Sequence, residues 1–346
     1  MADTMRAWEL TGHGGPEVLR WRERPVPDPG PGQVLVRVTA AALNNTDVWT
    51  RTGAYGLPGD PAARAGWRGP LRFPRIQGGD AAGVVAAAGP GVDGVPAGRR
   101  VLVDPARYER DDPDAGPVGL LGSEADGAFA GFLLADAGRV HDVGDSPLTD
   151  AELAALPVAY GTAAGMLERG RIGPGETVLV TGASGGVGLA LVQLAAARGA
   201  HVVAVTSAAK AAAVRAAGAG ATVDRAGGAA AVAAAAPDRL DAVLDVAGGD
   251  LLPALLPAVR DGGRWVIAGA VAGPVVELDL RRLYLHNVSL VGSSMHTRAH
   301  FDGLVAQARA GTVRPRIAAR YPLAELPAAQ AEFLRGQHVG KIVLAP

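Results

Sequence analysis

The stretch Thr177-Val-Leu-Val-Thr-Gly-Ala-Ser-Gly-Gly-Val-Gly188 decides the fold class of the second half of this chain. A short apolar run leads into a cluster of glycines, and a helical pattern over residues 189–198 follows. Glycine lets the backbone turn sharply and approach a pyrophosphate, whose charge is stabilised by the free amides of a helix N-terminus. Ala183 replaces the first glycine of the usual G-x-G-x-x-G, but the position between strand and helix still predicts a dinucleotide-binding turn.

The sequence around this turn alternates between strand-like and helical patterns. Apolar runs at 177–181, 201–206, 221–224, 240–245, 264–269 and 288–292 are separated by helical stretches. This spacing predicts parallel βαβ units in an α/β fold, a Rossmann-type doubly wound parallel sheet. Before residue 140, short apolar runs at 34–40, 83–88, 100–104 and 128–134 alternate with turn residues and predict a barrel-like β domain. Thr149 and Glu152 have the spacing of a capping box, which predicts a helix start.

Composition excludes several classes of function. The 346 residues carry 33 basic and 34 acidic side chains, so electrostatics favours neither nucleic acid nor an anionic membrane as a partner. The absence of Cys excludes disulfides, thiolate zinc sites, iron–sulfur clusters and a cysteine nucleophile. No apolar run approaches the ~20 residues of a membrane span, and residues 1–30 lack a signal-peptide core. We expect a soluble cytoplasmic protein.

The end of the second predicted strand indicates which nicotinamide cofactor binds. An NAD site usually places an acid there to bind the ribose 2'-hydroxyl. This strand ends in Thr206-Ser207, and Lys210 follows one helical turn later. A hydroxyl and an ammonium suit a 2'-phosphate, so the sequence favours NADPH.

Further motifs carry a family resemblance. Gly161-Thr162, Asp245-Val-Ala-Gly-Gly249, Gly262-Gly-Arg264 and Gly340-Lys-Ile-Val-Leu344, together with the glycine turn, resemble the medium-chain dehydrogenase/reductase superfamily, and within it the zinc-free quinone oxidoreductase and enone reductase branch. The resemblance implies a GroES-like β-barrel catalytic domain over residues 1–140 and a Rossmann NADPH-binding domain over 141–285. Residues 286–346 would supply the last Rossmann strand and return to the catalytic domain. It also implies a homodimer that pairs through a late strand near 288–291.

The resemblance also bears on the metal. Zinc-dependent members bind catalytic zinc at three positions that match Asn44, Gly79 and Val158 here, and none of these can be a normal zinc ligand. We therefore expect no metal. Without zinc to polarise a carbonyl, reduction of a conjugated acceptor is the easier reaction, because its negative charge spreads into an enolate or phenolate. The expected function is NADPH-dependent hydride transfer to a quinone or α,β-unsaturated carbonyl. A zinc-independent alcohol dehydrogenase or ketone reductase and a non-catalytic NADPH-binding protein remain alternatives.

The same resemblance implies the site residues. Asn44, Thr46 and Tyr55 are the candidate catalytic residues, with a turn amide, a helix cap and a pocket wall as their respective alternatives, and Asp47 is predicted to cap a helix. Lys341 is expected to approach the cofactor phosphates, His296 to be a solvated loop residue, and residues 56–71 to form a lid or a surface insertion. The residues expected to bind cofactor are Asn44, Thr162, Ser184, Gly185, Gly186, Val187, Gly188, Ser207, Lys210, Ala247, Gly269, Ala270, Ser294, Met295 and Lys341.

Overall fold

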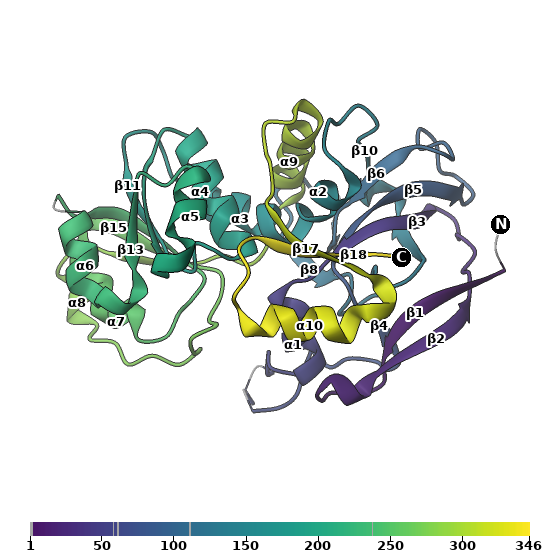
Figure 1. Ribbon diagram of the computed structural model, residues 1–346, viewed down its shortest axis with the longest axis horizontal. Coiled ribbons are helices and arrows are strands. Elements are labelled where there is room, and N and C mark those ends of the chain that lie inside the picture. Colours follow the sequence, from purple (N-terminus) through teal and green to yellow (C-terminus); the bar gives the residue numbers. More distant parts are fainter. Residues whose placement is uncertain (1–2, 58, 61, 111, 237) are drawn as a thin grey trace. The chain divides into compact units, whose positions relative to one another are not determined.

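A computed structural model describes residues 3–57, 59–60, 62–110, 112–236 and 238–346. The chain divides into two compact units (Figure 1). Unit 1 comprises Met1–Val158 and Thr297–Pro346, and unit 2 comprises Ala159–His296. Within the described ranges, no helix is long and apolar enough to cross a membrane.

Unit 1 is a β unit built on one large sheet. Its described part contains seven paired strands in the order β10-β6-β5-β3-β18-β17, with β9 also paired to β3. The alternating apolar residues of β3 pack into the core with Phe129 and Leu133, and β18 brings the C-terminus back beside β3 (Figure 1). The strands of this sheet are β3 (Gln33–Ala42), β5 (Asp80–Ala88), β6 (Arg100–Val103), β9 (Phe132–Asp136), β10 (Val140–Asp142), β17 (Ile317–Pro322) and β18 (Lys341–Ala345).

Smaller elements complete unit 1. A second sheet has the order β2-β1-β4, and β7 pairs with β8. These strands are β1 (Thr4–Leu10), β2 (Leu19–Pro25), β4 (Arg75–Ile76), β7 (Ala106–Tyr108) and β8 (Pro117–Leu120). The helices are α1 (Asn45–Thr52), α2 (Asp150–Ala154), α9 (Arg298–Ala310) and α10 (Leu326–Arg335).

Unit 2 is a doubly wound α/β unit. Its described strands form a sheet in the order β13-β12-β11-β14-β15-β16, in which every neighbouring pair is parallel. This is the Rossmann order, with β11 as the first strand. The strands are β11 (Thr177–Val180), β12 (His201–Thr206), β13 (Ala221–Asp224), β14 (Leu240–Asp245), β15 (Val259–Ile267) and β16 (Ser289–Gly292). The helices are α4 (Gly186–Ala197), α5 (Ala211–Ala216), α6 (Gly228–Ala235), α7 (Leu251–Leu255) and α8 (Arg281–Tyr284). Most of α3 (Pro157–Arg169) also belongs to unit 2, because the unit begins at Ala159.

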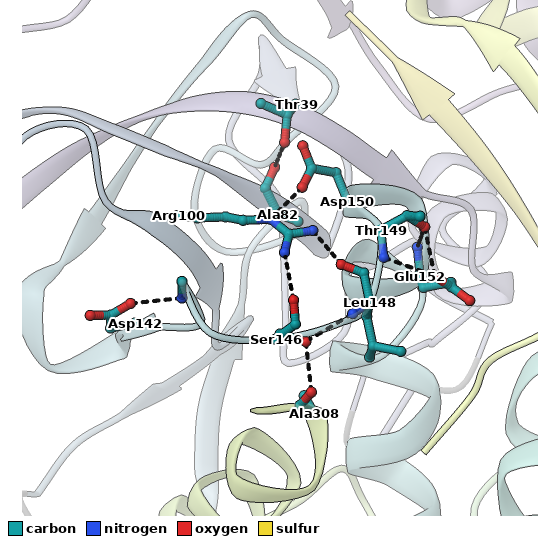
Figure 2. Close-up of polar contacts among 11 residues, drawn as sticks. Thr39, Ala82, Arg100, Asp142, Ser146, Leu148, Thr149, Asp150, Glu152 and Ala308 are labelled. Atoms are coloured by element: carbon teal, nitrogen blue, oxygen red, sulfur yellow. Dashed lines mark hydrogen bonds and ion pairs between the residues drawn. The ribbon is translucent and has the colours of Figure 1, made fainter. Parts of the chain in front are cut away.

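The first stretch of unit 1 extends to Val158, and residues 141–158 pack on its β sheet. Figure 2 shows Arg100 of β6 donating to the carboxylate of Asp150 at 2.6 Å and to the backbone oxygen of Leu148 at 2.5 Å. Thr149 and Glu152 form the predicted capping box at the start of α2. Unit 2 ends at His296, so it includes all six parallel strands, the last of which the sequence placed in residues 286–346.

Candidate active site

Asn44 is the central residue of a buried polar cluster in unit 1, at the junction of β3 and α1. Its backbone N–H donates to Asp47 Oδ2 at 2.7 Å, so Asp47 has the capping role predicted for it. The Asn44 side chain donates from Nδ2 to Asp80 Oδ2 at 2.8 Å and to the backbone oxygen of Ala42 at 3.3 Å. Asn44 is therefore more than a turn amide.

Lys341, the first residue of β18, completes this cluster. Its Nζ donates to Asp80 Oδ2 at 2.8 Å, to Asn44 Oδ1 at 2.5 Å and to the backbone oxygen of Leu43 at 2.8 Å. An ammonium has three N–H donors, and these contacts use all three. Only 4% of the Lys341 residue surface is exposed. The phosphate role that the resemblance implies for Lys341 would require it to give up one of these partners.

Asn44, Gly79 and Val158, the three positions that the resemblance matches to zinc ligands, lie close together in unit 1. Asp80 is fully buried, and its Oδ1 accepts the backbone N–H of Val158 at 2.7 Å while its Oδ2 faces Asn44. A Cβ added at Gly79 would lie 3.1 Å from Val158 Cγ2. The positions therefore converge, but they offer an amide, a hydrogen atom and an isopropyl group. Among the described residues, no three His, Cys, Asp or Glu side chains are grouped to hold a metal. These residues do not fit a zinc ion.

Asp47 has an unusual protonation equilibrium. Burial is the main cause that raises the pKa of its carboxyl to about 7 from an ordinary value of 3.8, and the negative charge of Asp80 raises it further. The backbone N–H groups of Asn44 and Gly79 and the ammonium of Lys341 lower it. Gln77, which directly follows β4, donates to the backbone oxygen of Asp47 at 2.9 Å and so links the first turn of α1 to that strand.

Thr46 and Tyr55, the other two candidate catalytic residues, are hydrogen-bonded partners. The Tyr55 hydroxyl donates to Thr46 Oγ1 at 2.7 Å, and its ring stands edge-on to Trp49. Burial raises the pKa of Tyr55 well above its ordinary value, so the phenol stays protonated at neutral pH. This pair is a hydroxyl source at the start of α1.

In the segment 56–71, Trp67 and Arg68 are hydrogen-bonded to other residues of unit 1. The backbone N–H of Trp67 donates to Ser123 Oγ at 3.0 Å, and that of Arg68 donates to Glu124 Oε1 at 2.8 Å. The Arg68 guanidinium also stacks on the Trp67 ring. Residues 58 and 61 of the expected lid lie outside the described residues. The lid role stays a prediction.

The glycine turn of unit 2 has the geometry that its sequence predicted. β11 ends at Val180, and α4 begins at Gly186 with Gly185 as its N-cap. Gly182 has a φ of 56°, where a side chain would be strained. A Cβ at Gly188 would lie 2.2 Å from the backbone oxygen of Gly182, so only glycine allows the helix to approach the strand this closely. Ser184, Gly185, Gly186, Val187 and Gly188 thus occupy the turn and the first turn of the helix.

A buried carboxylate organises the next strand end. Asp245 Oδ1 accepts the Thr181 hydroxyl at 2.6 Å and the backbone N–H of Ala247 at 2.9 Å, and its Oδ2 accepts the Trp265 indole N–H. Close contacts link this loop to the end of β15, since a Cβ at Gly269 would lie 2.7 Å from the backbone oxygen of Val246. The expected cofactor residues Ala247, Gly269 and Ala270 therefore lie together at the carboxyl ends of β14 and β15.

A polar and basic group lies at the end of β12. The buried Thr206 hydroxyl has no hydrogen-bond partner within the described residues. Ser207 follows, and Lys210 has a pKa lowered by burial and by the positive charge of Arg225. Sequence reasoning missed Arg225, which directly follows β13. Asp224 Oδ2 accepts the backbone N–H of Ala208, which joins the two strand ends.

The segment after β16 is held against α3 within unit 2. Arg169 donates to Ser293 Oγ at 3.0 Å and to the backbone oxygen of Met295 at 2.9 Å. Met295 has a φ of 51°, rare for a residue with a side chain, and its sulfur accepts the Thr162 hydroxyl at 3.5 Å. This places the expected residues Thr162, Ser294 and Met295 in one group. Sequence reasoning missed Arg169, because nothing in the sequence distinguishes it from other arginines.

The prediction of a solvated His296 is wrong. Its ring is fully buried, and a Cβ at Gly161 would lie 2.2 Å from His296 Nδ1. The glycine leaves room for the imidazole, so His296 is a packing residue beside α3.

Comparison with known proteins places this geometry in a family. Residues 30–145 match the family model of the alcohol dehydrogenase GroES-like domain, and residues 186–309 match that of the zinc-binding dehydrogenases. The acryloyl-coenzyme A reductase of Metallosphaera sedula is 30% identical over 98% of this chain and 99% of its own length. The chain belongs to the medium-chain dehydrogenase/reductase superfamily. It is an oxidoreductase of this superfamily, and the predicted α/β class with GroES-like and Rossmann parts is confirmed.

Other relatives match over nearly the whole chain. The quinone oxidoreductase of Mus musculus is 28% identical over 98% of this chain and 97% of its own. A solved structure from Sinorhizobium meliloti 1021, described as an alcohol dehydrogenase, has a TM-score of 0.96 at 47% identity and covers 100% of this chain and 98% of its own. A cobalt- and zinc-bound alcohol dehydrogenase from Pyrobaculum aerophilum has a TM-score of 0.86 at 33% identity and covers 99% of this chain and 100% of its own. A crotonyl-CoA carboxylase/reductase in complex with NADP has a TM-score of 0.83 at 25% identity and covers 99% of this chain and 95% of its own.

Proposed function

We propose that this protein is a metal-independent, NADPH-dependent reductase that transfers hydride to a quinone or an α,β-unsaturated carbonyl. The observation that carries the proposal is the composition of the metal position in unit 1. Asn44 supplies an amide there, Asp80 is bound to the Lys341 ammonium, and Gly79 and Val158 supply no ligand atom. A site of this kind would orient and polarise a substrate by hydrogen bonds rather than by the Lewis acidity of a metal ion.

The chemistry of a conjugated acceptor suits these groups. NADPH supplies the hydride when bound, and the protein supplies orientation and proton donors. Hydride delivered to the β-carbon leaves an enolate, whose oxygen needs a hydrogen-bond donor and finally a proton. Tyr55 is protonated at neutral pH and is hydrogen-bonded to Thr46, so the pair could donate to that oxygen, with water in the solvent restoring the phenol proton.

Unit 2 offers the groups that NADPH requires. The N-terminus of α4 and the glycine turn before it would hold the pyrophosphate, because Gly188 permits close backbone approach and the helix amides favour negative charge. Ser207, Lys210 and Arg225 would hold the 2'-phosphate, and a phosphate between the two cations would relieve their mutual repulsion. The Thr206 hydroxyl, which has no partner in the described part of the chain, offers a further donor.

Relatives support both parts of this proposal and also one competitor. Reductases of acryloyl-coenzyme A and of quinones match over nearly the whole chain, and an NADP complex is among the structural neighbours. The Sinorhizobium meliloti structure described as an alcohol dehydrogenase, at 47% identity, favours a second candidate, a zinc-independent alcohol dehydrogenase or ketone reductase.

A substrate panel separates these candidates. NADPH oxidation is measured with a 1,4-quinone, a 2-enone, an enoyl-coenzyme A and a saturated ketone, each with and without a zinc chelator. Turnover of a conjugated acceptor in chelator is the expected result. Turnover of the saturated ketone alone would establish the second candidate, binding of NADPH without turnover of any substrate would indicate a non-catalytic protein, and activity that needs added zinc would refute the proposal.

We also propose a homodimer formed through unit 2. β16 is the last strand of its sheet and has no neighbour on one side within the described residues. The segment before it exposes apolar side chains, with Val275 86% exposed and Leu285 63% exposed. An unpaired strand edge beside an apolar surface is a place where a second copy can pair by a two-fold axis.

A further inference from the structure

The polar cluster of Asn44, Asp80 and Lys341 contains a buried positive charge whose three donors are all directed at groups of unit 1. Lys341 and Asp80 are 261 residues apart in sequence, and Asp80 is completely buried. Burying two charges costs free energy, which their attraction offsets only when further hydrogen bonds satisfy both groups. Here both are satisfied: Asp80 accepts from Val158, Asn44 and Lys341, and Lys341 also donates to Asn44 and Leu43.

The place of this charge in the unit is informative. The three positions that the resemblance matches to zinc ligands lie around Asp80, and their side chains do not fit a metal. The Lys341 ammonium lies 2.5 Å from the Asn44 oxygen and 2.8 Å from Asp80 Oδ2. The positive charge carried by β18 is thus buried directly beside the Asn44 amide and the Asp80 carboxylate.

The ammonium also fixes the orientation of the Asn44 amide. Lys341 can only donate hydrogen bonds, so the amide atom that faces it must be the oxygen. Nδ2 must then face Asp80 and Ala42, as it does. Without the ammonium, the amide could turn over and present either end to Asp80 and its surroundings. The charge acts through Asn44, because no donor of Lys341 is left for another molecule.

We infer that Lys341 is a positioning residue of the catalytic unit: its ammonium occupies a buried cation position formed by the oxygens of Leu43, Asn44 and Asp80, and it holds the Asn44 amide in one orientation. The effect on turnover rests on the proposed function, whereas the occupation of the cation position does not. Lys341 then serves the reacting end of the site rather than the cofactor phosphates.

Chemical rescue tests the cation position directly. Lys341→Ala removes the ammonium and its carbon chain and leaves the oxygens of Leu43, Asn44 and Asp80 around a vacated volume. Methyl-, ethyl- and propylammonium chloride are added to the wild type and the variant, with sodium chloride and tetramethylammonium chloride at equal ionic strength as controls. We expect the primary alkylammonium ions to raise the melting temperature of Lys341→Ala by several degrees over the controls and to leave the wild type unchanged. Rescue should vanish in Lys341→Ala/Asp80→Asn. Equal effects of all salts on the variant would overturn the inference.

A second variant covers the case in which Lys341→Ala does not fold. Lys341→Met/Asp80→Asn keeps the volume of the cluster and leaves no unpaired charge, so the folding penalty is small. We expect its NADPH dissociation constant, measured by quenching of protein fluorescence, to stay within about twofold of the wild type, while kcat falls by about tenfold or more. An increase of about tenfold in the NADPH dissociation constant with unchanged kcat would show that Lys341 binds phosphate and would refute the positioning role.

The two proposals can fail independently. If the wild type reduces none of the panel substrates, the proposed function is wrong, but the alkylammonium effect on melting temperature still decides whether Lys341 holds a cation position. If the wild type is active and Lys341→Met/Asp80→Asn keeps full kcat and NADPH affinity, the positioning role is wrong and the reductase function stands.

Discussion

Asp47 makes the stability of the catalytic unit depend on pH in a direction opposite to that of most carboxylates. Its folded pKa of about 7 lies above its ordinary value of 3.8, which we take for the unfolded chain. Between these two values the folded state binds more protons than the unfolded state, so the free energy of unfolding falls as pH rises. The contribution of Asp47 is thus fully present below pH 3.8, declines through the interval and levels off above pH 7.

The size of this effect follows from the pKa difference. Each pH unit inside the interval costs about 1.4 kcal/mol, so between pH 5.5 and pH 7 the wild type loses about 2 kcal/mol through Asp47. Asp47→Asn cannot ionise and does not lose it. For a unit of this size, about 2 kcal/mol corresponds to roughly 4 to 8 °C in melting temperature.

Thermal unfolding of the two proteins at pH 5.5, 6.5, 7.5 and 8.5 measures this difference. Loss of one acceptor oxygen at the start of α1 adds a constant offset to Asp47→Asn, but only the change with pH matters. The melting temperature of the variant should rise relative to the wild type up to about pH 7.5 and then stay constant. Asp93→Asn, which removes an exposed carboxylate, is the matched control. Parallel curves for Asp47→Asn and the wild type, or a relative fall with pH, would refute the argument.

Other predictions concern cofactor, assembly and metal. Lys210→Ala should raise the Michaelis constant for NADPH by about tenfold and that for NADH little, because only NADPH carries the 2'-phosphate; equal losses for both would show that Lys210 does not contact that phosphate. Arg225→Ala should have the same selectivity, which steady-state kinetics with both cofactors can check. Light scattering at micromolar concentration should show a dimer for the wild type and a monomer for Leu285→Asp, since a buried unpaired carboxylate would oppose the interface; a monomeric wild type would contradict the dimer. Purified protein should hold substoichiometric zinc by elemental analysis and keep its activity in chelator, and activity lost in chelator but restored by zinc would count against a metal-free site.

The local features of this protein are readable from its sequence, because each depends on residues close together in the chain. The glycine turn is one example, since Gly182 and Gly188 are required by a backbone that turns within a few residues. The capping box of Thr149 and Glu152 is another, because its hydrogen bonds span three residues. The strand of β12 follows from its unbroken apolar run, which suits a parallel strand covered on both faces. The order of such elements already implies the class of the sheet.

Only the tertiary structure determined which groups, distant in the sequence, each side chain contacts. Asn44 is the N-cap of α1, and its amide also contacts Asp80 and Lys341, because β18 returns beside β3. His296 looks like a solvated loop residue, but Gly161 on α3 leaves the space in which its ring is buried. Such contacts depend on where the chain returns after many residues, and the free energy of burying a charge or an imidazole depends on every group that surrounds it. The spacing of residues in the sequence does not determine that free energy.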